Sequence, residues 1–306
     1  MYTYIGRRLL MMIPVLFGVS IIVFALINLT PGDPVAILLD QDATVDEINR
    51  LREQLGLDQP WWLRYLQWAA GVLTGDWGES FRDSRPVLPM ILGFMPATLQ
   101  LVAASMLISV GVGVTAGVVS AVRQDSWFDH VTRIGAFLGL SMPNFWVGIM
   151  LILLFALHLR LLPASGRGGI LNLIMPAITL GTSGMATITR ITRSSMLEVM
   201  RQDYIRTARS KGLPERIVVY KHALRSALTA VLTIVGLQLG FGLGGTVIVE
   251  SVFAWPGIGR FAYQRMMQRD YPMIMGNLLM FATLFCLVNL LVDVTYALVD
   301  PRIRYE

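Results

Sequence analysis

The chain has 306 residues, of which 55% are apolar and 15% are charged, with a formal net charge of +5. Soluble domains carry about 25% charged residues, so this composition leaves too little polar surface for an ordinary soluble fold. The single cysteine, Cys286, excludes an internal disulfide.

Six runs contain no Asp, Glu, Lys or Arg and are long enough for a helix to cross the bilayer's hydrocarbon core, which takes about 20 residues. Each is predicted to form a transmembrane helix, because backbone groups in lipid must be satisfied within the segment. The sequence therefore predicts an all-α polytopic membrane protein with six transmembrane helices. The runs are residues 9–29, 97–122, 134–157, 170–189, 226–249 and 271–292.

Residues 1–30 are predicted to form the N-terminal transmembrane helix. Arg7 and Arg8 precede its apolar run, as they would in a signal peptide. The run is too long for a signal peptide and no A-x-A cleavage site follows it, so a retained helix is predicted.

Residues 31–96 are predicted to form a structured extracytoplasmic loop with short helices. A capping box at residues 44–47 and a helix stop at Gly56 frame one helix, and an aromatic-rich helix follows at residues 61–68. Aromatic clusters beside a membrane usually lie at the headgroup level. This one either braces the helical bundle or forms a docking surface for an external partner.

Residues 97–300 are predicted to form the transmembrane core. Gly113 and Gly117 in the second run have G-x-x-x-G spacing, which predicts close helix packing. Pro143 lies in the middle of the third run, where proline can kink a helix. Arg and Lys are more frequent in the loops that share a side with the termini, which predicts that both termini are cytoplasmic.

Residues 190–225 are predicted to form a cytoplasmic coupling loop. Asp203 fits the N-cap of a short helix that stops at Gly212, and a second helix is expected to begin near Glu215. A loop that only carries positive charge is the alternative. Because breakers bound the short helix on both sides, it is interpreted as an element that transmits force from a soluble partner.

In the fifth run, Gly236, Gly240 and Gly244 form two overlapping G-x-x-x-G spacings, which predict helix packing or a place beside a transport path. The chain has no P-loop motif for phosphate binding. Ionisable residues inside the runs are scarce, and Glu250 at the end of the fifth run is expected to pair with polar neighbours.

The segment "TARSKG" resembles the cytoplasmic EAA loop of ABC-importer permeases. Thr207, Ala208 and Gly212 match that motif, whereas Arg206 replaces its usual glutamate and its later proline is absent. The segments "LREQLGLDQPWWLRYLQW", "GDWGES", "VFAWPGIGRFAYQRMMQRDYP" and "DPRIRY" resemble the first permease subunit of dipeptide, oligopeptide and nickel importers. The resemblance covers nearly the whole chain.

This resemblance implies a type I ABC-importer permease fold in a bacterial inner membrane. It implies three kinds of partner besides the lipid bilayer: a second homologous permease, two ATP-binding subunits and an extracytoplasmic substrate-binding protein. ATP and Mg²⁺ would be bound by the ATP-binding subunits, so this chain is expected to be non-catalytic, without cofactor, metal or nucleic acid. The residues expected to couple to an ATPase are Asp203, Arg206, Thr207, Ala208, Lys211 and Gly212.

The substrate predicted from the resemblance is a dipeptide or longer peptide, with nickel chelates and glutathione as alternatives. An ion-coupled secondary transporter would need inverted repeats and charged groups near the midplane, and neither is evident in the sequence. A passive membrane scaffold would leave the segmented basic loop unexplained.

Overall fold

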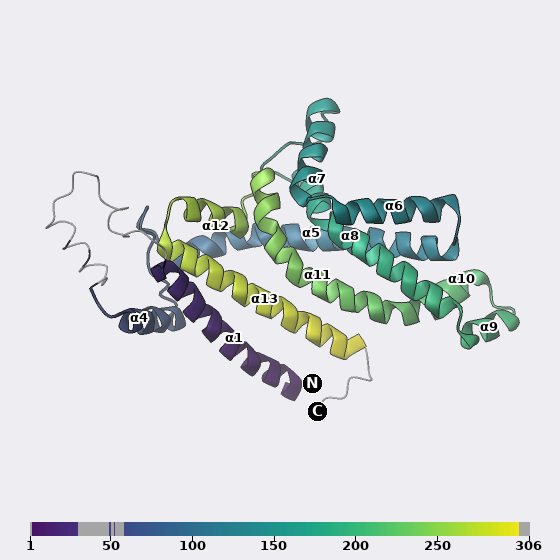
Figure 1. Cartoon of the computed structure of the whole chain (residues 1–306), viewed down its shortest axis with the longest axis horizontal. Helices are drawn as coiled ribbons and strands as arrows, with labels where there is room; N and C mark the ends of the chain where they lie inside the picture. The colour runs from purple at the N-terminus through teal and green to yellow at the C-terminus, as the bar shows by residue number, and fades with distance from the viewer. Residues whose placement is uncertain (1, 30–48, 50–51, 53–57, 300–306) are drawn as a thin grey trace. The chain divides into compact units, whose positions relative to one another are not determined.

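The computed structural model describes residues 2–29, 49, 52 and 58–299, and this part of the chain is helical without any β-strand (Figure 1). The predicted capping box at residues 44–47, the stop at Gly56 and the terminal motif at residues 300–305 lie outside the described residues.

Five of the six apolar runs form helices that are long and apolar enough to cross a bilayer, which confirms the prediction for these runs. Each helix is longer than the uncharged run that it contains, because residues before or after the run continue the helix. The five helices are α1 (Tyr2–Leu29), α5 (Val87–Val122), α8 (Ile170–Met200), α11 (Leu224–Val252) and α13 (Tyr271–Val299).

The third run, predicted as a span at residues 134–157, is not one straight helix, and it gives a sixth span if its two bent parts cross the membrane together. It is divided between α6 (Trp127–Ser141) and α7 (Asn144–Leu151), which continues as a π-helix over Ile152–His158. The two parts are bent by 110°. Pro143 causes the break, because proline lacks a backbone donor and holds the preceding residue, Met142, in an extended conformation with φ −82° and ψ 130°.

The chain divides into two compact units, one formed by residues 1–96 with 260–287 and the other by residues 97–259 with 288–306. In the second unit, α8 packs against α6 on one side and α11 on the other, and α7 also contacts α8 and α11 (Figure 1). Helix α8 is therefore the central helix of this unit.

Glycines allow α5 to approach α8 closely. A Cβ atom at Gly113 would lie 2.8 Å from Ile188 Cγ2, and one at Gly117 would lie 2.6 Å from Thr192 Cβ. These separations are too short for any side chain, so the packing predicted from the glycine spacing in the second run is confirmed.

We expect Gly117→Ala to destabilise the protein by about 1–3 kcal/mol, because the added methyl group must displace α8. Gly111→Ala on the same helix is the matched control, since a Cβ there meets no atom within 4 Å. Thermal unfolding of the detergent-purified importer would measure both. Equal unfolding midpoints for the two variants would contradict the close packing.

In the first unit, the aromatic-rich helix is α4 (Trp61–Thr74), and it packs on α1 (Figure 1). The Tyr65 ring makes an edge contact with Phe24 at 5.5 Å between centroids, and its hydroxyl is hydrogen-bonded to Ser20. Trp61 remains 65% exposed. Part of the aromatic cluster therefore braces α1, as one of the two interpretations expected.

A loop of the same unit is fastened to the turn that precedes α13. The buried Asp270 carboxylate accepts hydrogen bonds from Ser80 Oγ at 2.6 Å and from the Phe81 amide at 3.1 Å. Arg265 bridges Asp270 and Asp83. These hydrogen bonds and ion pairs thus hold the end of the motif "GDWGES" and the residues after it against the residues before α13.

Glu250 is fully buried near the end of α11, in the second unit. It accepts a hydrogen bond from Thr98 Oγ1 at 2.6 Å, and Thr98 in turn accepts one from the amide of Ile258, the first residue of α12 (Ile258–Met267). Only glycine fits at position 257, because a Cβ there would overlap the Glu250 carboxylate. The expected pairing of Glu250 with polar neighbours is confirmed.

Candidate functional site

The short basic helix predicted in the loop after α8 is present as α9 (Asp203–Ser210). Gln202, rather than Asp203, is its N-cap, and Asp203 is the first helical residue. This shifts the predicted start by one position, because Gln202 keeps the extended conformation of a cap (φ −74°, ψ 151°). Gly212 has φ +75°, a left-handed conformation that favours glycine and ends the helix as predicted.

One face of α9 is anchored in a hydrophobic core. Ile205 is fully buried and Ala208 is 8% exposed, and both belong to a cluster that joins α9 to α5, α8 and the start of α11. The other buried members of this cluster are Val118, Ala121, Met196, Val199, Val218, Val219, Ala223 and Ala227. Helix α9 is therefore held rigidly at one end of α8 (Figure 1).

The opposite face of α9 is exposed and mostly basic. Of the six predicted coupling residues, Ala208 lies on the packed face, whereas the others are exposed: Asp203, Arg206, Thr207, Lys211 and Gly212. A soluble partner could therefore bind the exposed basic face of α9, which includes Arg206 and is followed by Lys211, while the packed face holds the helix in place.

An ion pair closes the loop after α9. Arg209 Nη2 lies 2.6 Å from Glu215 Oε1, and this hydrogen-bonded carboxylate raises the pKa of the Arg209 guanidinium above its ordinary value. Glu215 begins α10 (Glu215–Ile217), from which the chain continues through a π-helix (Val218–Ala223) into α11, so the second helix begins where the sequence predicted. Pro214 and Gly212 separate the two helices.

A buried ion pair that was not predicted from the sequence holds α6 to α8. Asp129 is fully buried, and its two carboxylate oxygens accept hydrogen bonds from Arg193 Nε and Nη2, each at 2.7 Å. Ser120 of α5 also donates to Asp129, and Ser126 Oγ caps the Asp129 amide. The S-x-x-D pattern at residues 126–129 could have indicated the cap, but no local signal indicates Arg193.

A polar pocket of about 70 Å³ lies between α5, α7, α8 and α11 in the second unit. Asn144 and Gln238 contribute carboxamides, and in the described part of the chain neither side chain has a hydrogen-bond partner. Hydroxyl groups and glycines complete the wall: Ser105, Ser109, Ser183, Gly181, Gly184, Gly242 and Gly245. A carboxamide inside a span is costly in hydrocarbon unless it is hydrogen-bonded, so these two side chains are candidates for contact with a polar group from outside the chain.

Two sequence features could have indicated the polar pocket. Gln238 is the single carboxamide in the fifth uncharged run, and Asn144 directly follows the proline that breaks the third. A polar residue inside a span is a functional signal by default. What the sequence did not show is that the two side chains line one pocket.

The three predicted glycines of α11 have different surroundings. Gly236 lines an apolar cleft of about 160 Å³ between α11 and α13, together with Leu239 and Leu291. Gly240 is buried. Gly244 is exposed, and a Cβ there would meet no atom within 4 Å, whereas one at Gly245 would lie 3.1 Å from Leu180 Cδ1. Within the described chain, the close contact is thus at Gly245 and not at Gly244.

Long apolar helices, a broken span beside a polar pocket and a rigid basic helix at one end are features of membrane transporter subunits. Its fold resembles that of the MetNI methionine ABC transporter in inward-facing conformations, with a TM-score of 0.58 over 70% of this chain and 97% of that chain at 19% identity. An amino acid ABC transporter gives a TM-score of 0.51 at 17% identity, over 71% of this chain and 95% of its own. The fold is that of a type I ABC-importer permease, as predicted.

Sequence comparison identifies the family. Residues 113–305 match the binding-protein-dependent transport system inner membrane component, and residues 1–102 match the N-terminal part of such components. The chain belongs to this family, and is a multi-pass inner-membrane permease. The resemblance drawn from the sequence motifs is confirmed.

Individual relatives match over the full length of both chains. The dipeptide transport system permease proteins DppB of Alkalihalophilus pseudofirmus and Escherichia coli are 43% and 41% identical to this chain. The glutathione transport system permease protein GsiC of Escherichia coli is 42% identical.

Proposed function

We propose that this chain is one of two permease subunits of an ATP-driven importer of dipeptides and oligopeptides. The observation that carries this proposal is the full-length identity of 41–43% to permeases named for dipeptide transport. The 42% identity to a glutathione permease supports glutathione as a second candidate, and nickel chelates remain an alternative. Peptides and glutathione both present amide groups, which suits a pocket lined by carboxamides.

The proposed complex contains a second homologous permease, two ATP-binding subunits and an extracytoplasmic binding protein that delivers the substrate. ATP and Mg²⁺ would bind to the ATP-binding subunits, and this chain would catalyse nothing itself. Helix α9 supports that division of labour, since it combines an exposed basic ridge with a buried anchor. We propose that its exposed residues seat in one ATP-binding subunit, and that Ala208 supports them from the packed face.

The bias of Arg and Lys supports an orientation with both termini and the 190–225 loop in the cytoplasm. In that orientation the segment predicted as the extracytoplasmic loop, residues 31–96, lies between the 1–30 helix and the 97–300 core, with residues 87–96 forming the start of α5. Labelling single cysteines placed at Lys211 and at Asp76 with a membrane-impermeant reagent in intact cells tests this. Labelling of the Lys211 position from outside would contradict the orientation.

We propose that the polar pocket lies beside the path taken by the substrate. Gln238 is near the middle of α11, and Asn144 begins α7 at the break in the third span. Secondary transporters bind their substrates where a discontinuous helix exposes polar groups near the bilayer midplane, and we propose that the same physical principle applies to this permease. Gly244 is exposed on the same helix, and we propose that the second permease subunit packs against α11 at this position.

Replacement of Gln238 by methionine is expected to reduce ATP-dependent dipeptide uptake roughly tenfold. Without the Gln238 carboxamide, a desolvated amide of the passing peptide loses its hydrogen-bond partner, which costs about 1–3 kcal/mol. Methionine keeps the length of the side chain and removes its donor and acceptor. Leu237→Met is the control, since Leu237 is adjacent, 56% exposed and outside the pocket. Uptake into proteoliposomes that hold the complete importer measures both, and equal uptake would remove Gln238 from the path.

The proposed function itself is tested with wild-type proteoliposomes that contain both permeases, the ATP-binding subunits and the binding protein. Dipeptide accumulation should require internal ATP and the binding protein. Glutathione supplied in the same way tests the second candidate. Accumulation driven by an imposed ion gradient without ATP would overturn the proposal.

A further inference from the structure

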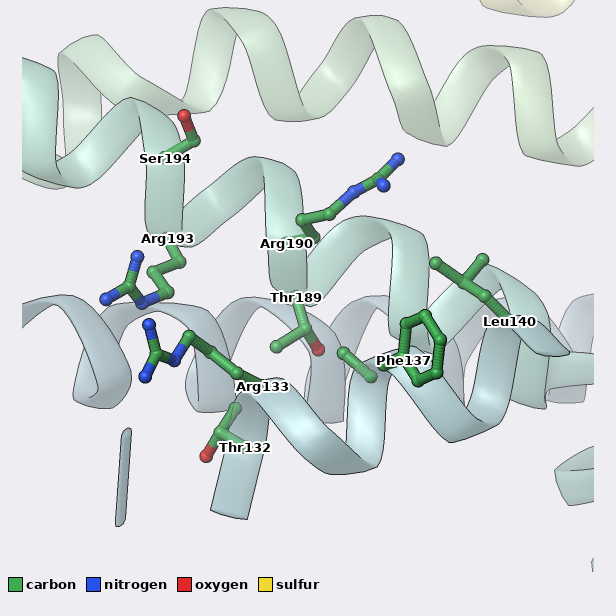
Figure 2. A pocket seen from close by; sticks show the side chains of 9 residues that line it. Thr132, Arg133, Phe137, Leu140, Thr189, Arg190, Arg193 and Ser194 are labelled. Atoms are coloured by element: carbon green, nitrogen blue, oxygen red, sulfur yellow. The ribbon is translucent and has the colours of Figure 1, made fainter. Parts of the chain in front are cut away.

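A cleft of about 390 Å³ lies between α6 and α8 and is separate from both α9 and the polar pocket (Figure 2). Arg133, Arg190 and Arg193 line it together with Thr132, Thr189 and Ser194, and its remaining lining residues are Ala136, Phe137 and Leu140. We call this the basic cleft. It combines three guanidinium groups and three hydroxyl groups with an apolar section.

The basic cleft carries an uncompensated positive charge. Arg193 is neutralised by Asp129, but its Nη1 takes no part in that ion pair. Arg133 contacts His130, and neither Arg133 nor Arg190 has a carboxylate partner within the described residues. Arg133 and Arg190, which both line the cleft, therefore carry positive charges that no carboxylate of the described residues neutralises.

The polar and apolar sections of the cleft are at different depths in the predicted membrane. Arg190 directly follows the uncharged run of residues 170–189, and Arg133 directly precedes the uncharged part of α6, residues 134–141. Both arginines therefore lie at the border between hydrocarbon and headgroups. Phe137 and Leu140 lie one and two turns further into the uncharged run, and they are 69% and 40% exposed.

Figure 2 shows this separation of groups. In this view the Arg133 and Arg193 guanidinium groups are both at one end of the cleft, and Phe137 and Leu140 lie toward the other end. Arg190 extends from α8 away from this pair of guanidinium groups. A ligand that fills the cleft needs an anionic head and an apolar tail.

We propose that the basic cleft binds an anionic phospholipid, with the phosphodiester at Arg133 and Arg193 and an acyl chain along Phe137 and Leu140. Basic pockets between transmembrane helices on the cytoplasmic side bind anionic headgroups in this way. A free phosphate ion would satisfy the arginines but would leave the apolar section without a ligand. In the proposed orientation, the cytoplasmic leaflet of the membrane around the importer supplies the lipid.

The test uses the complete importer, delipidated in detergent, with native mass spectrometry to measure the binding of dioleoylphosphatidylglycerol. We expect Arg133→Gln to weaken this binding roughly fivefold, since an arginine near an anionic surface contributes about 1 kcal/mol. The matched control is Arg201→Gln, which removes the same charge at an exposed position outside the cleft. Equal weakening by both variants would overturn the proposal.

Three further measurements separate the lipid from other ligands. Dioleoylphosphatidylcholine should bind equally to wild type and variant, and glycerol 1-phosphate without acyl chains should not compete at equal concentration. Phe137→Ala should weaken phosphatidylglycerol binding more than Leu138→Ala, because Leu138 is exposed on the same helix but does not line the cleft. Full competition by glycerol 1-phosphate, or loss of the second permease from the arginine variant with unchanged lipid binding, would overturn the proposal.

Discussion

Replacing Gly212 by aspartate is expected to reduce ATP-dependent uptake at least tenfold while the chain remains folded. Aspartate is among the residues that tolerate the left-handed conformation found here, and a Cβ at this position meets no atom within 4 Å. The chain's own packing therefore changes little. If α9 seats in an ATP-binding subunit, however, the new carboxylate is placed in or beside that interface, where an unpaired charge costs well over the roughly 1.4 kcal/mol that corresponds to tenfold.

Gly75→Asp is the matched control for this variant. Gly75 also has a positive φ, of +90°, and open space around its Cβ position, but it ends α4 rather than α9. Uptake, ATP hydrolysis and retention of the ATP-binding subunits during purification should be measured for both variants. Normal uptake and normal complex assembly in Gly212→Asp would remove the loop from the coupling mechanism.

Asp129→Asn is expected to have the largest effect on stability, about 3 kcal/mol, and to lower the unfolding midpoint of the purified importer by several degrees. The substitution leaves the Arg193 guanidinium without its anion between α6 and α8. It also removes the charge that Ser120 and the Asp125 amide stabilise by hydrogen bonding. The energetic cost comes mainly from the uncompensated cation that remains.

Asp203→Asn makes the same chemical change in an exposed ion pair. Asp203 and Arg206 are 3.5 Å apart, with side chains 96% and 74% exposed, so their pairing should contribute less than about 1 kcal/mol. Asp129→Asn combined with Arg193→Met should recover part of the lost stability, because no unpaired charge is then left. Similar midpoints for Asp129→Asn and Asp203→Asn would contradict the structural role of the buried pair.

Helix α8 joins the proposed sites of this chain. It carries Gly181 and Gly184 at the polar pocket, Arg190 and Arg193 at the basic cleft, and Met196 and Val199 in the core that anchors α9. At 1.5 Å per residue, Gly184 and the end of the helix at Met200 are about 24 Å apart. A movement of α9 could therefore reach the polar pocket through one rigid element.

Much of the fold could be predicted because the relevant signals are local. Uncharged runs located five long helices, and the glycine and proline after Lys211 located the end of α9 and the start of the next helix at Glu215. The start of α9 was wrong by one residue, since cap assignment depends on the backbone conformation of Gln202 as well as on residue type. A kink at Pro143 could be expected from the sequence of the third run, but the sequence does not show how far the chain turns there, and the angle is 110°.

By itself, the sequence determined the membrane class, the helices and the basic segment bounded by helix breakers, because each depends on neighbours along the chain. Only the tertiary structure decided which polar groups meet. Asp129 and Arg193 are 64 positions apart, and the carboxamides of Asn144 and Gln238 come from different helices. Side chains on separate helices are brought together by the packing of those helices, and that packing follows from the shapes and contacts of many residues at once.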